Sequence, residues 1–377
     1  MSEKDIRNSV TAIHPGEILK DMLLGHNMSQ KELAATIGKS TPVVNDILSK
    51  KRDINVEIAI LLEAVFEDTP AAFWLDCQSK FDIELTRQLD RVKELEQGIK
   101  DWKSLEDLIN FRVIKKRAGI GDSVLKDLGY LCDLYKATAV SHLRENLSIT
   151  YNSAYFKKSE VSQTDIRNLN TWILLTRIAN EGQKLSARFN IDNVKQLINR
   201  LNDIFFINVR TLDGVKSVLN EFGIKFFVEK KLDKVPVDGY SFWLDENPTI
   251  VVTTRYSWLD NLAFTIFHEL GHIVSHLYND KSQDFLDIIE PGSQRKEETE
   301  KIADDFATTC LRRGCDMLSF FKKIRNPFSA GPLLCRIANT YSINEGIVVG
   351  QYQHYCNTVL RTPSAFAIGA KLKQKIK

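Results

Sequence analysis

The 377-residue sequence lacks paired cysteines, long apolar runs and a marked net charge. Its six cysteines form no CxxC pair, which favours reduced thiols in core positions over disulfides or a thiolate metal site. No apolar run reaches the roughly 18 residues that a bilayer-spanning helix needs, and the polar start MSEKDIRNSV is unlike a signal peptide. A net charge of +2 favours no class of partner. We therefore expect a cytoplasmic protein that does not contact a membrane.

The chain has no internal repeat, so its divisions rest on changes of pattern along the sequence. Residues 1–85 have the pattern of short helices, and residues 86–215 that of a helical connecting region. From 216 to 377, short β-type runs precede an apolar helix and further helices. The sequence predicts a multidomain protein with an all-α first domain, a helical middle, and an α+β domain that contains a small sheet.

The apolar segment NLAFTIFHELGHIVSHLYND contains His268, Glu269 and His272 in its middle. A helix that is apolar on nearly all sides is expected to be buried, and burying these groups without partners is costly. His268 and His272 are four residues apart, so both can hold one metal ion. HExxH is the zinc-protease signature, in which Glu269 acts as the catalytic base beside the metal. The alternative is a pair of hydrogen-bonded core histidines, for which an apolar helix offers few partners.

A catalytic zinc usually takes three protein ligands and a water, and the stretch EETEKIADDFATTCLRR supplies a carboxylate. A close-packing face of this helix is expected from three small residues: Ala303, Ala307 and Cys310. Glu300 lies on that face and is the predicted third ligand. Asp304, one turn later, is the predicted acceptor that orients a histidine ring. Glu297 and Glu298 lie nearer the solvated end and fit an acidic surface.

The stretch MSQKELAATIGKSTPVVNDILSKKRDIN has the layout of a helix-turn-helix, with Ser29 capping one helix, a break at Gly38 and a second helix from Thr41. Four exposed positions are expected to meet base edges in a major groove: Ser40, Thr41, Val43 and Asn45. Four basic residues flank them and suit phosphate contacts: Lys39, Lys50, Lys51 and Arg52.

Charge gives only partial support to this assignment. Residues 1–80 hold nine lysines and arginines against twelve acids, whereas up to Arg52 the basic residues lead by eight to six. A local basic face on an acidic domain is compatible with DNA binding. The alternative is a helical protein-interaction module.

With HPGEILKDML ahead and FWLDCQSKFD behind, this segment resembles the HigA-type antitoxin domain of the Xre class. The resemblance implies operator DNA as a partner. A homodimer is also expected, because two copies can place their reading helices one helical turn of DNA apart.

The run TIFHELGHIVSH followed by ETEKIADDFA is similar to the ImmA/IrrE group of gluzincin-type metallopeptidases. That group has HExxH and then ExxA[ND]xFA, and five residues match the second pattern: Glu300, Ala303, Asp304, Phe306 and Ala307. Related sequences often have a carboxylate just before the alanine, where this chain has Ile302. The runs RYSWLDNLAFTIFHELGH and INEGIVVGQYQH resemble the subgroup with an amino-terminal DNA-binding domain. The resemblance implies a zinc endopeptidase with a gluzincin-like fold, which in some relatives cuts a repressor.

The expected chemistry follows from these residues. Zinc would lower the pKa of its water toward about 7, and Glu269 would pass the proton of that water to the leaving amine. The strand TIVVTTR is expected to bind an extended peptide at its edge. His276, Arg255 and Tyr240 are candidates for stabilising the oxyanion.

The function expected from the sequence is a transcriptional regulator with a zinc endopeptidase domain that cleaves a repressor or toxin partner. The alternative is a non-proteolytic antitoxin or repressor, whose zincin-like domain only binds or senses a partner.

Overall fold

The computed structural model describes residues 11–155, 165–253, 257–282, 284–288, 298–324, 326, 329–357 and 374–377. The chain divides into two compact units, Met1–Lys103 and Ser104–Lys377. The three-part division at residues 85 and 215 stays a prediction. Within the described ranges, no helix has the length and apolar character to cross a bilayer.

The first unit is helical. Its helices are α2 (Pro15–Gly25), α3 (Gln30–Thr36), α4 (Thr41–Leu48), α5 (Val56–Val65), α6 (Ala71–Arg87) and α7 (Asp90–Ser104), the last ending at the unit boundary. Local chemistry sets the bounds, because proline opens α2 and a reciprocal capping box between Ser29 and Glu32 opens α3. Gly38, with a φ of 64°, makes the left-handed turn into α4. The cap at Ser29, the break at Gly38 and the start of α4 at Thr41 are those that the sequence predicted.

The second unit contains further α-helices within the described residues. They are α8 (Phe111–Ala118), α9 (Val124–Leu134), α10 (Val140–Tyr155), α11 (Ile166–Glu181), α12 (Val194–Ile207), α13 (Thr211–Glu221), α14 (Leu259–His272), α15 (Glu298–Arg312), α16 (Met317–Lys322), α17 (Gly331–Tyr341) and α18 (Glu345–Tyr355). Two short elements add to them, the 3-10 turn η2 (Ile191–Asn193) and the π-helix η3 (Ile273–Leu277).

Among the described residues, four strands form one mixed sheet in the order β1-β3-β2-β4. Their bounds are β1 (Lys225–Glu229), β2 (Val237–Leu244), β3 (Asn247–Thr253) and β4 (Asp284–Ile288). β1 pairs with β3 in parallel, and β2 pairs antiparallel with both β3 and β4. The expectation that TIVVTTR offers a free edge is therefore wrong, because β3 is paired on both sides. The edge strands are β1 and β4, and β4 was not foreseen from the sequence.

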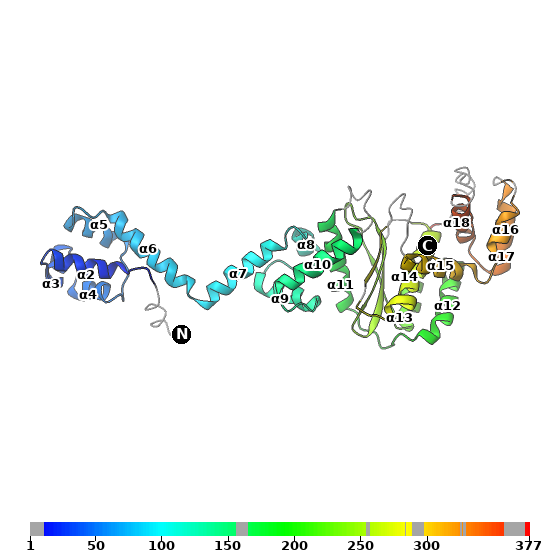
Figure 1. Cartoon of the computed structure of the whole chain (residues 1–377), viewed down its shortest axis with the longest axis horizontal. Helices are drawn as coiled ribbons and strands as arrows, with labels where there is room; N and C mark the ends of the chain where they lie inside the picture. Colours follow the sequence, from blue (N-terminus) through cyan, green and yellow to red (C-terminus); the bar gives the residue numbers. More distant parts are fainter. Residues whose placement is uncertain are drawn as a thin grey trace. The chain divides into compact units, whose positions relative to one another are not determined.

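The sheet separates two layers of helix, with α11 on one face and α14 on the other (Figure 1). A register shift between Val237 and Gly239 changes which residues of β2 face each layer. Tyr240 and Phe242 pack in the cluster with Trp172 of α11, whereas Trp243 packs against the core that contains α14. The same core includes α12, α13, α15, α17 and α18.

The helices α14 and α15 pack closely because small residues meet at their crossing. The expected close-packing face of α15 is confirmed, since Ala303, Ala307 and Cys310 are all buried. A Cβ on Gly271 would come 3.1 Å from Cα of Ala303, so glycine on one helix and alanine on the other allow the approach. This crossing places the first turn of α15 beside the last turn of α14.

Candidate metal centre and nucleic-acid interface

Three predicted metal ligands converge where α14 and α15 cross. One atom each from His268, His272 and Glu300 lies within 4.8 Å of the others. The Nε2 atoms of the two histidines are 3.0 Å apart. The Glu300 carboxylate oxygens lie 3.3 Å from Nε2 of His268 and 3.5 Å from Nε2 of His272. Two imidazoles and one carboxylate form a donor set that suits a catalytic zinc with one open position.

The protonation of this cluster favours a cation at its centre. Nδ1 of His268 lies 3.0 Å from Oδ1 of Asp304, and because a carboxylate only accepts, Nδ1 donates. The Nε2 atom of a neutral His268 then carries a lone pair. Burial lowers the pKa of His272 to about 3, and His268 beside it acts in the same direction. Without a metal, the two Nε2 atoms could share one hydrogen bond between the rings. That bond contains a single proton, whereas both Nε2 atoms also face the Glu300 carboxylate, which only accepts. The residues present therefore fit zinc.

Asp304 occupies the position behind His268 that was expected of it. Replacing it with Ala removes the acceptor that fixes the tautomer and orientation of the ring, and such changes typically cost about 10–100-fold in metal affinity. We expect a zinc dissociation constant raised by that factor for Asp304→Ala, measured by competition with a chromogenic chelator. Asp305→Ala is the matched control, because Asp305 is the next residue of α15 and is exposed. Equal affinities in the two variants would show that Asp304 does not support the site.

Glu269 is fully buried on α14 and packs against a glycine of the sheet. A Cβ added to Gly239 of β2 would lie 2.1 Å from Oε1 of Glu269, so no other residue fits there without movement of the carboxylate. Gly239 was missed in the sequence, although a glycine inside a strand often marks a close approach. The glycine fixes the depth at which the predicted base sits beneath the sheet.

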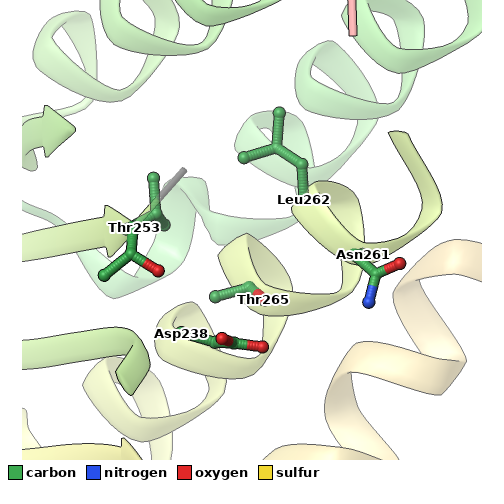
Figure 2. Close-up of a pocket in the computed structure, with 6 residues that line it drawn as sticks. Asp238, Thr253, Asn261, Leu262 and Thr265 are labelled. Carbon is green, nitrogen blue, oxygen red and sulfur yellow. The ribbon is translucent and has the colours of Figure 1, made fainter. Parts of the chain in front are cut away.

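A small polar cavity lies one turn before Glu269 on α14 (Figure 2). It is lined by Asp238, Val252, Thr253, Asn261, Leu262 and Thr265, and its volume is about 20 Å³. This is room for about one water molecule and too little for a substrate side chain. The hydroxyl of Thr253 donates to the carbonyl of Val237, which ties the end of β3 to the start of β2 at this point.

A π turn follows the second histidine and brings a third one near the site. The amide of Tyr278 donates to the carbonyl of Ile273 at 2.9 Å, a five-residue step. The ring of Phe285 from β4 stacks on His272 with centroids 4.3 Å apart, and lies 5.0 Å from the ring of His276. Both ring nitrogens of His276 are buried and have no hydrogen-bond partner among the described residues. β4 thus contributes an aromatic wall that the sequence did not reveal.

The other residues proposed from the sequence to stabilise the oxyanion are Tyr240 and Arg255. Tyr240 faces α11, where its hydroxyl donates to Asp284 of β4, so it is on the opposite side of the sheet from α14 and its assignment was wrong. Arg255 and the acidic residue Glu297 lie outside the described residues. Glu298 opens α15 and is exposed, as expected. His276 stays a prediction.

In the first unit, the four positions that are predicted to meet base edges lie in α4 or just before its start. Ser40, Thr41 and Asn45 are exposed. Val43 is half-buried and packs against the core, so it offers less surface than expected. The exposed start of α4 has no side-chain cap, which leaves the Ser40 hydroxyl without a bond to the helix it precedes.

The predicted phosphate contacts fall into two pairs. Lys39 makes an ion pair with Glu57 at 2.6 Å, and Lys50 makes one with Glu17. Lys51 and Arg52, in the turn after α4, are exposed. A charge already paired on the protein has less to gain from a phosphate, so the second pair carries more of the expected attraction.

Comparisons with known proteins match part of the chain, and the family model places its match near the amino terminus. The model described as Helix-turn-helix matches residues 19–74. Virulence-associated protein I of Dichelobacter nodosus is 32% identical over 83 residues, which is 22% of this chain and 76% of that protein. Virulence-associated protein A' of the same organism is 29% identical over 86 residues, again 22% of this chain and 75% of that protein.

Solved structures with similarity to about a quarter of this chain include antitoxins. The Pseudomonas aeruginosa antitoxin HigA with higBA promoter is 38% identical, with a TM-score of 0.22, over 23% of this chain and 92% of that one. An addiction module antidote protein of a HigA family from Coxiella burnetii is 30% identical, with a TM-score of 0.19, over 26% of this chain and 96% of that one.

Proposed function

Because the chain belongs to the helix-turn-helix family through its amino-terminal domain, we propose that it is a DNA-binding regulator of the antitoxin kind whose second unit is a zinc-dependent endopeptidase. The observation that supports the peptidase part is the convergence of His268, His272 and Glu300 with Asp304 behind the first histidine. The proposed partners are operator DNA and a repressor or toxin protein, and the proposed assembly is a homodimer.

The DNA-binding part is supported by the exposed side chains of α4 and of the turn after it. Thr41 and Asn45 lie on the exposed face of a helix whose other face is buried through Val44 and Ile47, as base contacts require. Lys51 and Arg52 follow that helix and are available to phosphates. The domain then reads sequence through α4 and is held on the duplex by the basic turn.

The double variant Lys51→Ala/Arg52→Ala is expected to weaken binding to all DNA sequences and to lower the slope of log affinity against log salt by about 0.9 for each phosphate that the protein no longer neutralises. Asn45→Ala should instead change sequence preference, since a good base contact is worth about 1–3 kcal/mol of discrimination. Fluorescence anisotropy at several salt concentrations, with a fragment from upstream of its own gene and a scrambled fragment, measures both.

The control is Lys80→Ala/Arg87→Ala, which removes the same charge from exposed positions on α6. An equal loss of DNA affinity in both double variants would show that the effect comes from net charge and not from the position of Lys51 and Arg52. Failure of the parent protein to bind the upstream fragment at low salt would remove the DNA-binding assignment.

The peptidase part assigns a role to each group around the metal cluster. When bound, zinc would acidify a water molecule and polarise a scissile carbonyl. Glu269 accepts the proton of the attacking water and delivers it to the leaving amine. Gly239 admits that carboxylate beneath the sheet, and Asp304 holds the His268 ring in its ligand orientation.

An extended substrate would add to β4 instead of β3. β4 pairs with β2 on one side, and within the described part of the sheet no strand covers its other side. Its Phe285 stacks on His272, so a peptide along this edge passes close to the metal cluster. Main-chain hydrogen bonds to an edge strand give affinity with little demand on sequence. A regulatory protein with an exposed extended segment is the substrate class that fits.

The test is to incubate the purified, zinc-loaded protein with the products of neighbouring genes and to follow their masses. A new fragment pair whose formation stops when a chelator removes the metal would support the peptidase. Unchanged masses for all of them would count against it.

A further inference from the structure

An ion pair that is buried mainly at its arginine end joins α11 to the first residue of β4. Nη2 of Arg177 lies 2.5 Å from Oδ2 of Asp284, and the two side chains are 15% and 30% exposed. The hydroxyl of Tyr240 donates to the same carboxylate oxygen at 2.8 Å. One carboxylate at the end of an edge strand therefore receives bonds from a helix and from the neighbouring strand.

Aromatic rings enclose this guanidinium. Its Cζ lies 4.8 Å from the ring centroid of Tyr135, at the end of α9, and 5.5 Å from that of Phe242 on β2. Burial raises the pKa of Tyr135 to about 12 and that of Tyr240 well above its usual value, so both phenols stay protonated. The positive charge of Arg177 is thus held by ring faces and one carboxylate, an arrangement that lysine cannot reproduce.

β4 is held on both of its faces. Successive side chains of a strand point to opposite sides, and Leu286 packs with the α11 cluster while Phe285 packs with the α14 core. Asp284 shares the face of Leu286 and meets Arg177 there. Phe285, the next residue, stacks on His272 and lies beside His276. The Arg177 contact is therefore one residue away from the wall of the metal cluster.

We propose that Arg177 is a positioning residue of the site, which acts through Asp284 to hold β4 where Phe285 contacts His272 and where the outer edge of the strand can accept a peptide. The part that concerns peptide binding rests on the proposed peptidase function. The helix α11, which carries Arg177, then supports the site from the opposite face of the sheet. β4 has five residues and pairs with another strand on one side, so few main-chain hydrogen bonds hold it in the sheet. The ion pair with Arg177 therefore contributes much of the stability of β4 against local opening.

The experiment compares Arg177→Gln with Arg200→Gln in the full chain. The control breaks an ion pair of the same kind, between Arg200 of α12 and Glu221 of α13, 2.5 Å long and more exposed. Hydrogen exchange of the β4 amides should accelerate about tenfold or more in Arg177→Gln only. With a cleaved substrate, KM should rise about tenfold while kcat and zinc content stay close to those of the parent. Arg177→Lys should recover part of both effects, because it keeps the charge but not the forked geometry.

Exchange and zinc content do not depend on cleavage, so they decide the proposal even if the parent proves to have no peptidase activity. Unchanged exchange in β4 for a folded Arg177→Gln protein would overturn it, as would a loss of kcat with KM unchanged. If Arg177→Gln does not fold, Tyr240→Phe removes a single hydrogen bond to Asp284 and keeps the ring. Faster exchange confined to β4 in that variant would support the proposal, and exchange equal to the parent's would refute it.

Discussion

Replacing Glu269 with Gln is expected to abolish cleavage and leave the rest of the protein intact. The amide has the same size as the carboxylate, so it keeps the packing against Gly239. Glu269 is not one of the three grouped metal ligands, so its replacement leaves that group complete. The amide cannot accept the proton of the attacking water, and losing such a base costs about a hundred- to ten-thousand-fold in rate. Zinc content, thermal unfolding and DNA affinity should therefore equal those of the parent while fragment formation, followed by mass spectrometry, disappears.

Glu298→Gln is the matched control, because it makes the same chemical change at an exposed position on α15. It should cut at the rate of the parent. The comparison of the parent with Glu269→Gln also tests the alternative function. If both proteins relieve repression or neutralise the partner equally and no fragment forms, the second unit only binds or senses a partner. The protein would then be a non-proteolytic antitoxin or repressor.

The helices of the first unit were predictable because their signals are local. Pro15, the Ser29 cap and the turn at Gly38 act within one turn of the residues they affect. Side-chain exposure was less predictable, since Val43 turned toward a core formed by other helices. The partners of Lys39 and Lys50 come from α5 and α2, and no pattern inside the helix-turn-helix indicates them.

For the candidate site, helix periodicity was sufficient where the ligands lie on two helices. Spacing placed His268 and His272 on one face, and small residues identified the face of α15 that carries Glu300. Strand order was not predictable, because the sequence of β3 does not show that β1 pairs with it in parallel and β2 takes its other edge. The Arg177–Asp284 contact joins residues 107 apart, so it emerges only from the folded chain.

Replacing Glu300 with Ala is expected to release the metal. In the structure its two carboxylate oxygens face Nε2 of His268 and Nε2 of His272, and without them a metal would keep two protein ligands. The loss of affinity should exceed the roughly 10–100-fold that removing an orienting residue costs. Dialysed parent should hold about one zinc per chain and Glu300→Ala close to none, measured by plasma emission spectrometry. Bound zinc also stabilises the folded state, by about 2.7 kcal/mol at a hundred times the dissociation constant, so added zinc should raise the unfolding temperature of the parent and leave that of Glu300→Ala unchanged.

The comparison that decides the ligand is Glu298→Ala. Glu298 is two residues away on α15, carries the same charge and is exposed, so its loss removes a negative charge from the same helix end without removing a ligand. Zinc content and zinc-dependent stabilisation should be those of the parent. If Glu298→Ala loses zinc while Glu300→Ala retains it, the carboxylate has been assigned to the wrong residue. If both retain it, the two histidines bind metal without α15, and the site lacks the three-ligand arrangement on which the peptidase proposal depends.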